Sequence, residues 1–198
     1  MTLCTIERHE IHCWCLSERD MTNNELLDAA LEYAANGWPV LPCWWVEAET
    51  GHCACFKGRG CLSPGKHPIG KLAPNGAENA SLDPKQVRSW WAQYPLANIG
   101  GLVGPRANKA VLDVESVDGH GIDGELCLRQ LEEGYREMLA PTASYVTGNN
   151  GRNSVFQCTA DDLKPTDYNL GPGVELRFAD NQYVLLPPSK TKGAYRWD

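Results

Sequence analysis

Apolar residues recur at helical spacing in three stretches of the chain. Asn23 or Asn24, Asp83 followed by Pro84, and Asp123 stand where helices commonly begin, because such side chains can accept hydrogen bonds from unpaired backbone amides. The apolar faces that follow consist of Leu27, Ala30, Leu31 and Ala34; of Val87, Trp90, Trp91 and Tyr94; and of Leu128, Leu131, Tyr135 and Met138. This spacing predicts three amphipathic helices.

Short apolar runs predict strands between and after these helices. The runs are WPVLP (38–42), ANIGGLVG (97–104), NKAVLDVE (108–115), TASYVTG (142–148), RNSVFQCT (152–159), VELRF (174–178) and QYVLLP (182–187). Residues 149–151, Asn-Asn-Gly, predict a hairpin turn, and residues 179–181, Ala-Asp-Asn, predict a second hairpin. Residues 43–79 show no regular period and need some other source of order. Since helices lie before and between the strands, we expect a mixed α+β domain and not a doubly wound parallel sheet.

Composition places the chain among folded proteins. Apolar residues make up 42% and charged residues 22% of its 198 residues. No run of about 18 apolar residues is present, so we expect no membrane span, and the N-terminus lacks the apolar core of a signal peptide. A second Met, at position 21, precedes the first helix. We therefore expect residues 1–20 to be an appendage or a mis-set start and residues 21–198 to form the domain.

Cysteine usage and charge narrow the setting. Nine cysteines, an odd number, in a chain without an export signal indicate a reducing compartment, so we expect a cytoplasmic protein. A net charge of −7 argues against a protein that coats nucleic acid over its whole surface. The charge is uneven, because residues 113–137 hold eight acids while residues 56–71 and 186–197 contain basic residues and no acid. Such local basic patches still allow a specific polyanion site.

Two carboxylates lie in the run AVLDVES, residues 110–116. Because side chains alternate along a strand, Asp113 and Glu115 share one face, where they repel each other unless a cation lies between them. Mg²⁺ or Mn²⁺ prefers such oxygen ligands, although the pair could also be hydrated at the solvent end of the strand. Glu175, beside Arg177 in another apolar strand, would complete three acids able to hold two metal ions, or would simply pair with Arg177.

Metal-binding residue types gather in the irregular segment. Cys53, Cys55, Cys61 and His67 have the spacing C-x-C-x5-C-x5-H, and three thiolates with one imidazole form a closed tetrahedral set for structural Zn²⁺. Zinc would order this loop, and the alternative is a thiol-rich loop without metal. The remaining candidates are Cys43 as a spare ligand, Cys4, His9, His12, Cys13 and Cys15 as a second site, and Cys127 and Cys158 as core residues.

Two further segments offer groups for phosphate. TGNNGRNS (147–154) places Arg152 at a hairpin where backbone amides can face phosphate oxygens, although Asn-Gly hairpins commonly just turn the chain. PPSKTKGAYRW (187–197) places Ser189 and Lys190 close behind a strand. That composition can hold a triphosphate or a nucleic-acid backbone, or it can form a solvated basic loop.

Taken in order, these segments resemble the bifunctional primase–polymerase (Prim-Pol) domain of the archaeo-eukaryotic primase superfamily. The resemblance covers about residues 24–198 and runs through ALEYAANGWPVLPC, CACFKGRGCLSPGKHP, NIGGLVG, VLDVES, TGNNGRNSVFQ, GVELRFADNQYVLLPPS and GAYRW. It implies a primase-like mixed sheet with flanking helices and a zinc-binding loop inserted at about residues 43–71. It also implies template-directed nucleotidyl transfer from NTP or dNTP to a 3′-hydroxyl, in plasmid, phage or mobile-element replication.

The resemblance implies a role for each site residue. The family's ligands for two Mg²⁺ or Mn²⁺ ions correspond to Asp113, Glu115 and Glu175, and its zinc ligands to Cys53, Cys55, Cys61 and His67. The residues expected to contact the nucleotide are Arg152, Asn153, Arg177, Ser189 and Lys190, with basic residues around 57–71 near the template. The implied partners are a single-stranded DNA template, the nucleotide and a replicative helicase domain or protein, with no membrane.

The chain departs from the family pattern at two positions. The position that usually carries His is Asn153, which can donate a hydrogen bond but cannot carry positive charge, and the later acid, commonly Asp, is Glu175. The first departure motivates an alternative, a catalytically degenerate domain that binds single-stranded nucleic acid or docks a helicase. A third hypothesis is a metal-dependent nuclease that uses the same three carboxylates.

Overall fold

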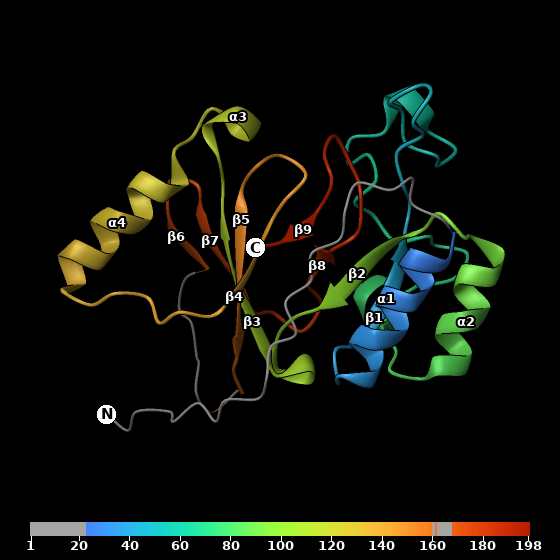
Figure 1. Cartoon of the computed structure of the whole chain (residues 1–198), viewed down its shortest axis with the longest axis horizontal. Helices are drawn as coiled ribbons and strands as arrows, with labels where there is room; N and C mark the ends of the chain where they lie inside the picture. Colours follow the sequence, from blue (N-terminus) through green and yellow to red (C-terminus); the bar gives the residue numbers. More distant parts are fainter. Residues whose placement is uncertain (1–22, 160, 162–167) are drawn as a thin grey trace.

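In the computed structural model, which describes residues 23–159, 161 and 168–198, the strands form two antiparallel sheets (Figure 1). The smaller sheet has the order β1-β2-β8, with β1 at Val40–Cys43, β2 at Asn98–Leu102 and β8 at Tyr183–Leu186. The larger has the order β6-β7-β3-β5-β4-β9, with β6 at Asn169–Gly171, β7 at Val174–Arg177, β3 at Lys109–Val114, β5 at Arg152–Gln157, β4 at Ala143–Val146 and β9 at Arg196–Trp197.

The helices divide between the two sheets. Helices α1 (Asn23–Ala35) and α2 (Pro84–Gln93) pack together beside β1, while α4 (Gly124–Tyr135) lies against β3, β6 and β7 (Figure 1). The short α3 (Val117–His120) follows β3, and 3-10 turns span Gly58–Gly60, Gly76–Asn79 and Pro105–Ala107. Two of the predicted caps are confirmed, because the Asp83 carboxylate accepts from the Lys85 amide and that of Asp123 from the Leu126 amide, each at 2.9 Å. The predicted cap at Asn23 or Asn24 lies outside what the structure describes, since α1 begins at Asn23.

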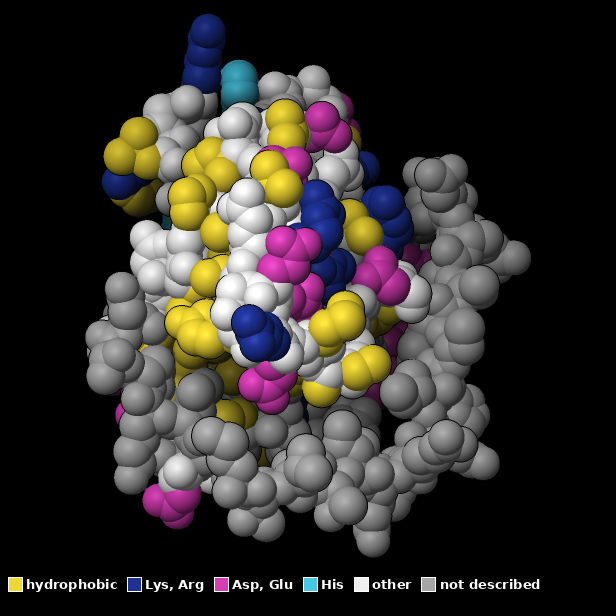
Figure 2. Space-filling view, turned by 90° about the vertical axis from the view of Figure 1, so that its left-hand side faces the viewer, with side chains coloured by type: hydrophobic (Ala, Val, Ile, Leu, Met, Phe, Trp, Pro, Cys, Tyr) yellow, Lys and Arg dark blue, Asp and Glu magenta, His cyan; other side chains and the backbone are white. Residues whose placement is uncertain are grey.

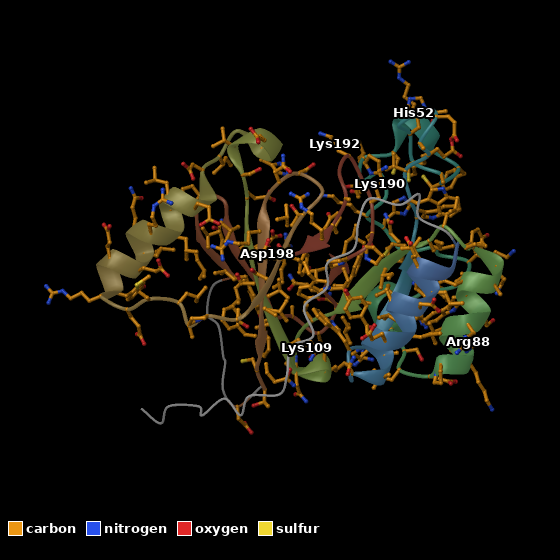
Figure 3. The ribbon with its side chains drawn as sticks, in the orientation of Figure 1. His52, Arg88, Lys109, Lys190, Lys192 and Asp198 are labelled. Carbon is orange, nitrogen blue, oxygen red and sulfur yellow. The ribbon has the colours of Figure 1, made fainter. Side chains whose placement is uncertain are left out.

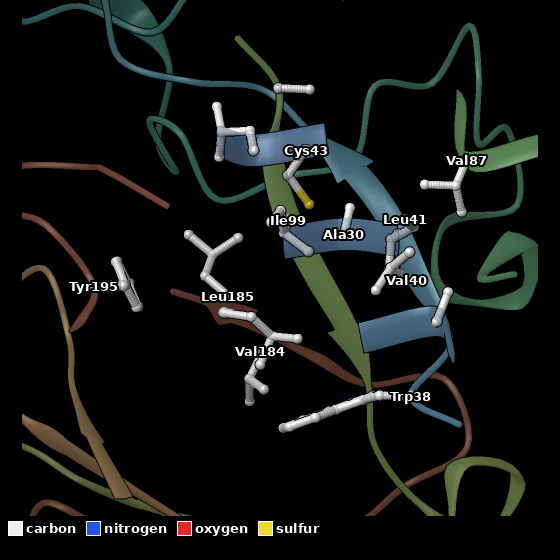
Figure 4. Close-up of a cluster of buried hydrophobic side chains, with 14 of the residues drawn as sticks. Ala30, Trp38, Val40, Leu41, Cys43, Val87, Ile99, Val184, Leu185 and Tyr195 are labelled. Carbon is white, nitrogen blue, oxygen red and sulfur yellow. The ribbon is translucent and has the colours of Figure 1, made fainter. Parts of the chain in front are cut away.

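One hydrophobic core joins both sheets. It contains Ala30, Val40, Leu41 and Ile99 from the smaller sheet and its helix (Figure 4). The larger sheet adds Val111 and Tyr145. Tyr145 is fully buried, and its hydroxyl lies 2.9 Å from the Leu185 carbonyl of β8. The two sheets are therefore packed against each other through side chains of β4 and β8.

The predicted hairpin at residues 179–181 is wrong as a strand pairing. The chain does turn there, since the Gln182 amide donates to the Ala179 carbonyl at 3.0 Å. However, β7 pairs with β3 whereas β8 pairs with β2, so the turn carries the chain from one sheet to the other. The segment between β2 and β3 crosses beside it, because the Val103 amide donates to the Gln182 carbonyl at 3.1 Å. The hairpin at residues 149–151 is confirmed, since β4 and β5 are antiparallel neighbours.

The apolar face of α4 is shorter than predicted. Leu128 is buried and Leu131 packs beside it, but Tyr135 and Met138 are 79% and 80% exposed. The helix ends at Tyr135 because Arg136 adopts a left-handed conformation, which turns the chain away before Met138.

The predicted fold class is confirmed as a mixed α+β, primase-like arrangement of sheets and helices that carries a Cys/His loop. None of the helices in the described ranges combines the length and hydropathy that a membrane span needs. Residues 1–20, and the second metal site predicted within them, lie outside the part of the chain that the structure describes.

Candidate active site

The β-sheet register brings the predicted acids to one face. Asp113 of β3 is the cross-strand partner of Asn153 on β5 and of Glu175 on β7. Directly opposed residues in an antiparallel pair project to the same side of the sheet. Glu115 follows immediately after β3 and is fixed there, because its amide donates to the Gly173 carbonyl at 2.8 Å. Acids from separate strands therefore meet at the end of β3.

Arg177 connects two of these acids. One guanidinium nitrogen lies 3.2 Å from Asp113 Oδ2 and 2.9 Å from Glu175 Oε2. Arg177 stands two residues after Glu175 on β7, so alternation places both side chains on the same face. The guanidinium thus partly neutralises a pair of carboxylates that would otherwise repel each other.

Glu115 lies in an environment that favours a nearby cation. Burial raises the pKa of the Glu115 carboxyl, the negative charge of Asp113 raises it further, and His120 acts in the opposite direction. The His120 Nε2 atom lies 3.4 Å from Glu115 Oε2. A raised pKa means that the ionised carboxylate is poorly stabilised by the protein alone, so a positively charged ligand would bind here favourably.

A cleft of about 190 Å³ opens beside these residues, between the two sheets. The larger sheet contributes Asp113, Asn153 and Arg177, and β8 contributes Tyr183, Val184 and Leu185. Lys66 reaches the cleft from the Cys/His loop, and the Tyr183 hydroxyl donates to its carbonyl at 2.8 Å. Glu115, Thr147, Asn149 and Tyr195 complete the lining.

Asn153 is packed as a partner of Asp113. Its side chain is 3% exposed, and the amide lies between the Asp113 carboxylate and the Tyr145 hydroxyl. In the orientation that satisfies its neighbours, Nδ2 donates to Asp113 Oδ1 at 2.8 Å, whereas the opposite orientation would set two acceptor oxygens against each other. This hydrogen bond fixes the orientation of the Asp113 carboxylate.

Three residues that were expected to contact the nucleotide, Arg152, Ser189 and Lys190, do not line the cleft. Arg152 neighbours Asn153 along β5 and so points to the opposite face, where it forms a two-pronged ion pair with Glu125 of α4 at 2.8 and 3.0 Å. Figure 2 looks onto this α4 side, where acidic and basic side chains lie next to one another. Ser189 is fully buried, and its hydroxyl accepts from the Ile99 amide at 2.8 Å. Lys190 is exposed on the loop after β8.

The Cys/His loop forms a compact ligand set. The metal-binding atoms of Cys53, Cys55, Cys61 and His67 all lie within 4.8 Å of one another. His67 Nε2 is 3.4 Å from Cys61 Sγ and 3.6 Å from Cys53 Sγ. Burial lowers the pKa of His67, which favours the neutral imidazole that binds metal. Three soft sulfur donors and one nitrogen fit a structural Zn²⁺ ion, as predicted from the spacing.

The other cysteines stand outside this set. Cys43 is fully buried in the main core, where burial raises its pKa, and it is not among the four residues whose metal-binding atoms gather in the loop. Cys127 and Cys158 are partly buried, and Cys127 packs against the core cluster around Leu128, so the expectation that both are core residues is met only in part. Cys43, Cys53, Cys55, Cys61 and Cys127 are free thiols.

The carboxylates suit a different class of metal. Their oxygens are the ligands that Mg²⁺ and Mn²⁺ prefer. The pKa of Glu115 is raised first by burial and then by the negative charge of Asp113. They converge less tightly than the zinc ligands, because the Cys/His set is the one group within 4.8 Å among the described residues. The Arg177 guanidinium lies between Asp113 and Glu175, so a metal ion would compete with it for the same oxygens.

Sequence reasoning missed several residues at this site. His120, Thr147, Asn149 and Tyr195 contact the acids or line the cleft. Thr147 and Asn149 lie in the TGNNGRNS segment, from which the sequence analysis selected only the backbone, Arg152 and Asn153. His120 follows Glu115 by five residues, and that spacing alone gives no sign of contact.

Comparison with known families agrees with this geometry. Residues 30–198 match the family described as bifunctional DNA primase/polymerase, N-terminal. None of the curated proteins compared with the chain matches it. The family match begins within α1 and covers the other helices, both sheets, the Cys/His loop and the cleft with its acids. The chain therefore belongs to the Prim-Pol family of bifunctional DNA primase/polymerases, whose general chemistry is nucleotidyl transfer.

Proposed function

We propose that this chain is a template-directed DNA primase/polymerase that uses Asp113, Glu115 and Glu175 to bind two Mg²⁺ or Mn²⁺ ions. The observation that carries the proposal is the register of β3, which sets Asp113 opposite Glu175 with Glu115 just beyond, beside a cleft between the sheets. When bound, the metal ions would lower the pKa of an attacking 3′-hydroxyl and neutralise charge on the leaving pyrophosphate.

The chain's own side chains supply the remaining functions. Lys66 and Arg177 line the cleft and offer positive charge to a triphosphate. Arg177 now lies between the Asp113 and Glu175 carboxylates, and it would be free to contact phosphate oxygens if those carboxylates held a divalent ion. Asn153 orients Asp113 and does not offer a free donor to the nucleotide. Lys190, exposed beyond β8, is a further candidate contact for phosphate.

Primer extension on single-stranded DNA with Mn²⁺ tests this proposal. We expect the wild-type chain to incorporate nucleotides and the Asp113→Ala variant to lose at least about 100-fold in rate, because metal-held charge supplies most of the stabilisation in such reactions. Asp180→Asn is the matched control, since Asp180 is an exposed acid beyond the other end of β7. Equal activity of wild type and Asp113→Ala would reject the proposal.

A second candidate function is favoured by one observation. Asn153 replaces the family's usual His and is committed to Asp113, so the cleft lacks that cationic contact. A degenerate domain would bind single-stranded nucleic acid, or dock a helicase, without incorporating nucleotides. Restoring the basic residue with Asn153→His separates the cases, because a gain of incorporation would indicate a weakened catalyst. Release of nucleotides from labelled DNA without added triphosphates would instead indicate the nuclease.

A further inference from the structure

The zinc loop comprises residues 52–67. Its tip carries two apolar side chains that are almost fully exposed to solvent. Phe56 is 93% exposed and Leu62 is 97% exposed. Each directly follows a metal-ligand cysteine, Cys55 or Cys61, and the 3-10 turn Gly58–Gly60 lies between them. The ligand cluster therefore holds both side chains outward on a short, braced segment. An aromatic ring that is exposed in this way, away from any core, has an open face on which a planar ligand can stack.

The charge around Phe56 selects the kind of ligand. The Lys57 ammonium lies 5.8 Å from the centre of the Phe56 ring, and Arg59 is exposed two residues further on. Residues 51–71 contain no acid, and the ion pairs found among the described residues involve neither Lys57 nor Arg59. An aromatic face beside unpaired cations suits stacked bases and phosphates, which is the combination that single-stranded nucleic acid offers.

The loop is also tied to the cleft. Lys66, which directly follows Gly65 in the chain, lines the cleft. The side-chain amide of Asn98 links Gly65 to Lys190, because it donates to the Gly65 carbonyl at 2.9 Å and to the Lys190 carbonyl at 2.8 Å. Lys190 and Lys192 lie on the side of their loop toward the segment that carries His52 (Figure 3). Basic side chains thus run from the acids of the cleft toward the tip at Phe56.

We infer that Phe56, with Lys57 and Arg59, forms a stacking site for a base of single-stranded nucleic acid that extends out of the cleft. The choice of nucleic acid as ligand rests on the proposed function, and the location of the site rests on the exposed ring and its cations. The ring stacks on a base irrespective of its identity, while the two cations contact adjacent phosphates. The site therefore adds affinity without adding sequence preference.

Fluorescence anisotropy with a labelled oligo(dT) strand, measured without added divalent ions, tests this inference. We expect Phe56→Ala to weaken binding by about 5- to 100-fold and Phe56→Trp to preserve it, because an aromatic face is what the base requires. Leu62→Ala is the matched control, equally exposed on the same loop but without a ring. The double variant Lys57→Ala/Arg59→Ala should lower the salt dependence of log Kd by about 0.7 per lost phosphate contact.

The zinc content and melting temperature of each variant establish that the loop is intact. Phe56→Ala that retains zinc yet binds DNA like wild type would overturn the inference. An equal loss in Leu62→Ala would also overturn it, because an apolar surface for a protein partner would then explain the tip better. Failure of the proposed function looks different. Nucleotide incorporation without Phe56-dependent binding rejects only the stacking site, whereas Phe56-dependent binding without any incorporation rejects only the catalyst.

Discussion

At the scale of single residues, Asp113 shows how an acid is kept in an apolar strand. An isolated buried carboxylate is costly, but Asp113 receives a hydrogen bond from Asn153 and an ion pair from Arg177. Glu175 shares the same guanidinium, and Glu115 has His120 nearby. The acids are thus held by protein partners, and under the proposed function a divalent ion would take the place of some of these partners.

Removing Arg177 separates its two roles. We expect Arg177→Ala to bind Mn²⁺ about 3- to 10-fold more tightly, because a cation that competes for the Asp113 and Glu175 oxygens is gone. The KM for nucleotides should rise in the same variant. Isothermal titration and initial rates measure both, with Arg106→Ala, exposed at the other end of the sheet, as control. Weaker Mn²⁺ binding would show that Arg177 supports the metal site.

Replacing Asn153 with an acid tests its hydrogen bond to Asp113. Asn153→Asp sets two carboxyls at hydrogen-bonding distance in a buried position, so we expect a loss of about 2–4 kcal/mol in the free energy of unfolding at pH 7.5. The new carboxyl has a higher pKa in the folded than in the unfolded state, so the deficit shrinks as pH falls through the folded value.

Urea unfolding at pH 7.5 and at pH 5 measures this change. Asn149→Asp is the control, because Asn149 is more exposed and its amide lies 3.2 Å from His120, an imidazole that can pair with an added carboxylate. A deficit in Asn153→Asp that is the same at both pH values would argue against contact with Asp113.

At the scale of elements, the zinc loop is the part most dependent on a ligand. Residues 52–67 form short turns and no regular strand. The four side chains of the Cys/His set bring separate parts of the loop together. Its far end is anchored by Asn98 and Tyr183, which contact Gly65 and Lys66. The loop therefore joins a tip that carries the Cys/His set to a base that contributes Lys66 to the wall of the cleft.

Loss of a zinc ligand should release this loop. We expect Cys61→Ser to contain much less than one zinc per chain, to expose residues 51–66 to proteolysis and to lower Tm by about 5–10 °C. Cys127→Ser, a thiol outside the set, should keep its zinc and its resistance to protease. Metal analysis and limited proteolysis provide the measurement. Full zinc occupancy in Cys61→Ser would contradict the assigned ligand set.

The contact between α4 and β5 is expected to be structural. Arg152→Ala removes the pair with Glu125, which is partly exposed, so the free energy of unfolding should fall by only about 0.5–1 kcal/mol. The KM for nucleotides should not change, because Arg152 lies on the face opposite Asp113. Chemical unfolding and steady-state kinetics check the two expectations. The control is Arg129→Ala on α4, the helix that carries Glu125. A large rise in KM would return Arg152 to the nucleotide site.

The sequence was informative about elements and less so about their partners. The strand of Asp113, the helix caps and the Cys/His set follow from local pattern alone. Side chains alternate along β5, so the adjacent residues Arg152 and Asn153 point to opposite faces of the sheet. The prediction that both contact the nucleotide did not take this alternation into account. The pairing of β7 with β3 instead of β8 depends on long-range register, which short spacing does not encode.

At the scale of the whole molecule, the cleft is a product of two sheets that share one core. The chain passes between them at residues 103–108 and again at 178–182, and Tyr145 of one sheet contacts Leu185 of the other. The acids lie on the larger sheet, while β8 and the zinc loop supply the opposite wall. Substrate binding is therefore expected where these separately built parts meet.

The central claim is that Asp113, Glu115 and Glu175 form one site for divalent ions. Electron paramagnetic resonance of free Mn²⁺, titrated with the zinc-loaded chain, measures this directly and does not require catalysis. We expect wild type and Asp180→Asn to bind Mn²⁺ alike, and Asp113→Asn and Glu175→Gln each to weaken binding by about tenfold or more. Mn²⁺ binding that is unchanged in Asp113→Asn and Glu175→Gln would contradict the account.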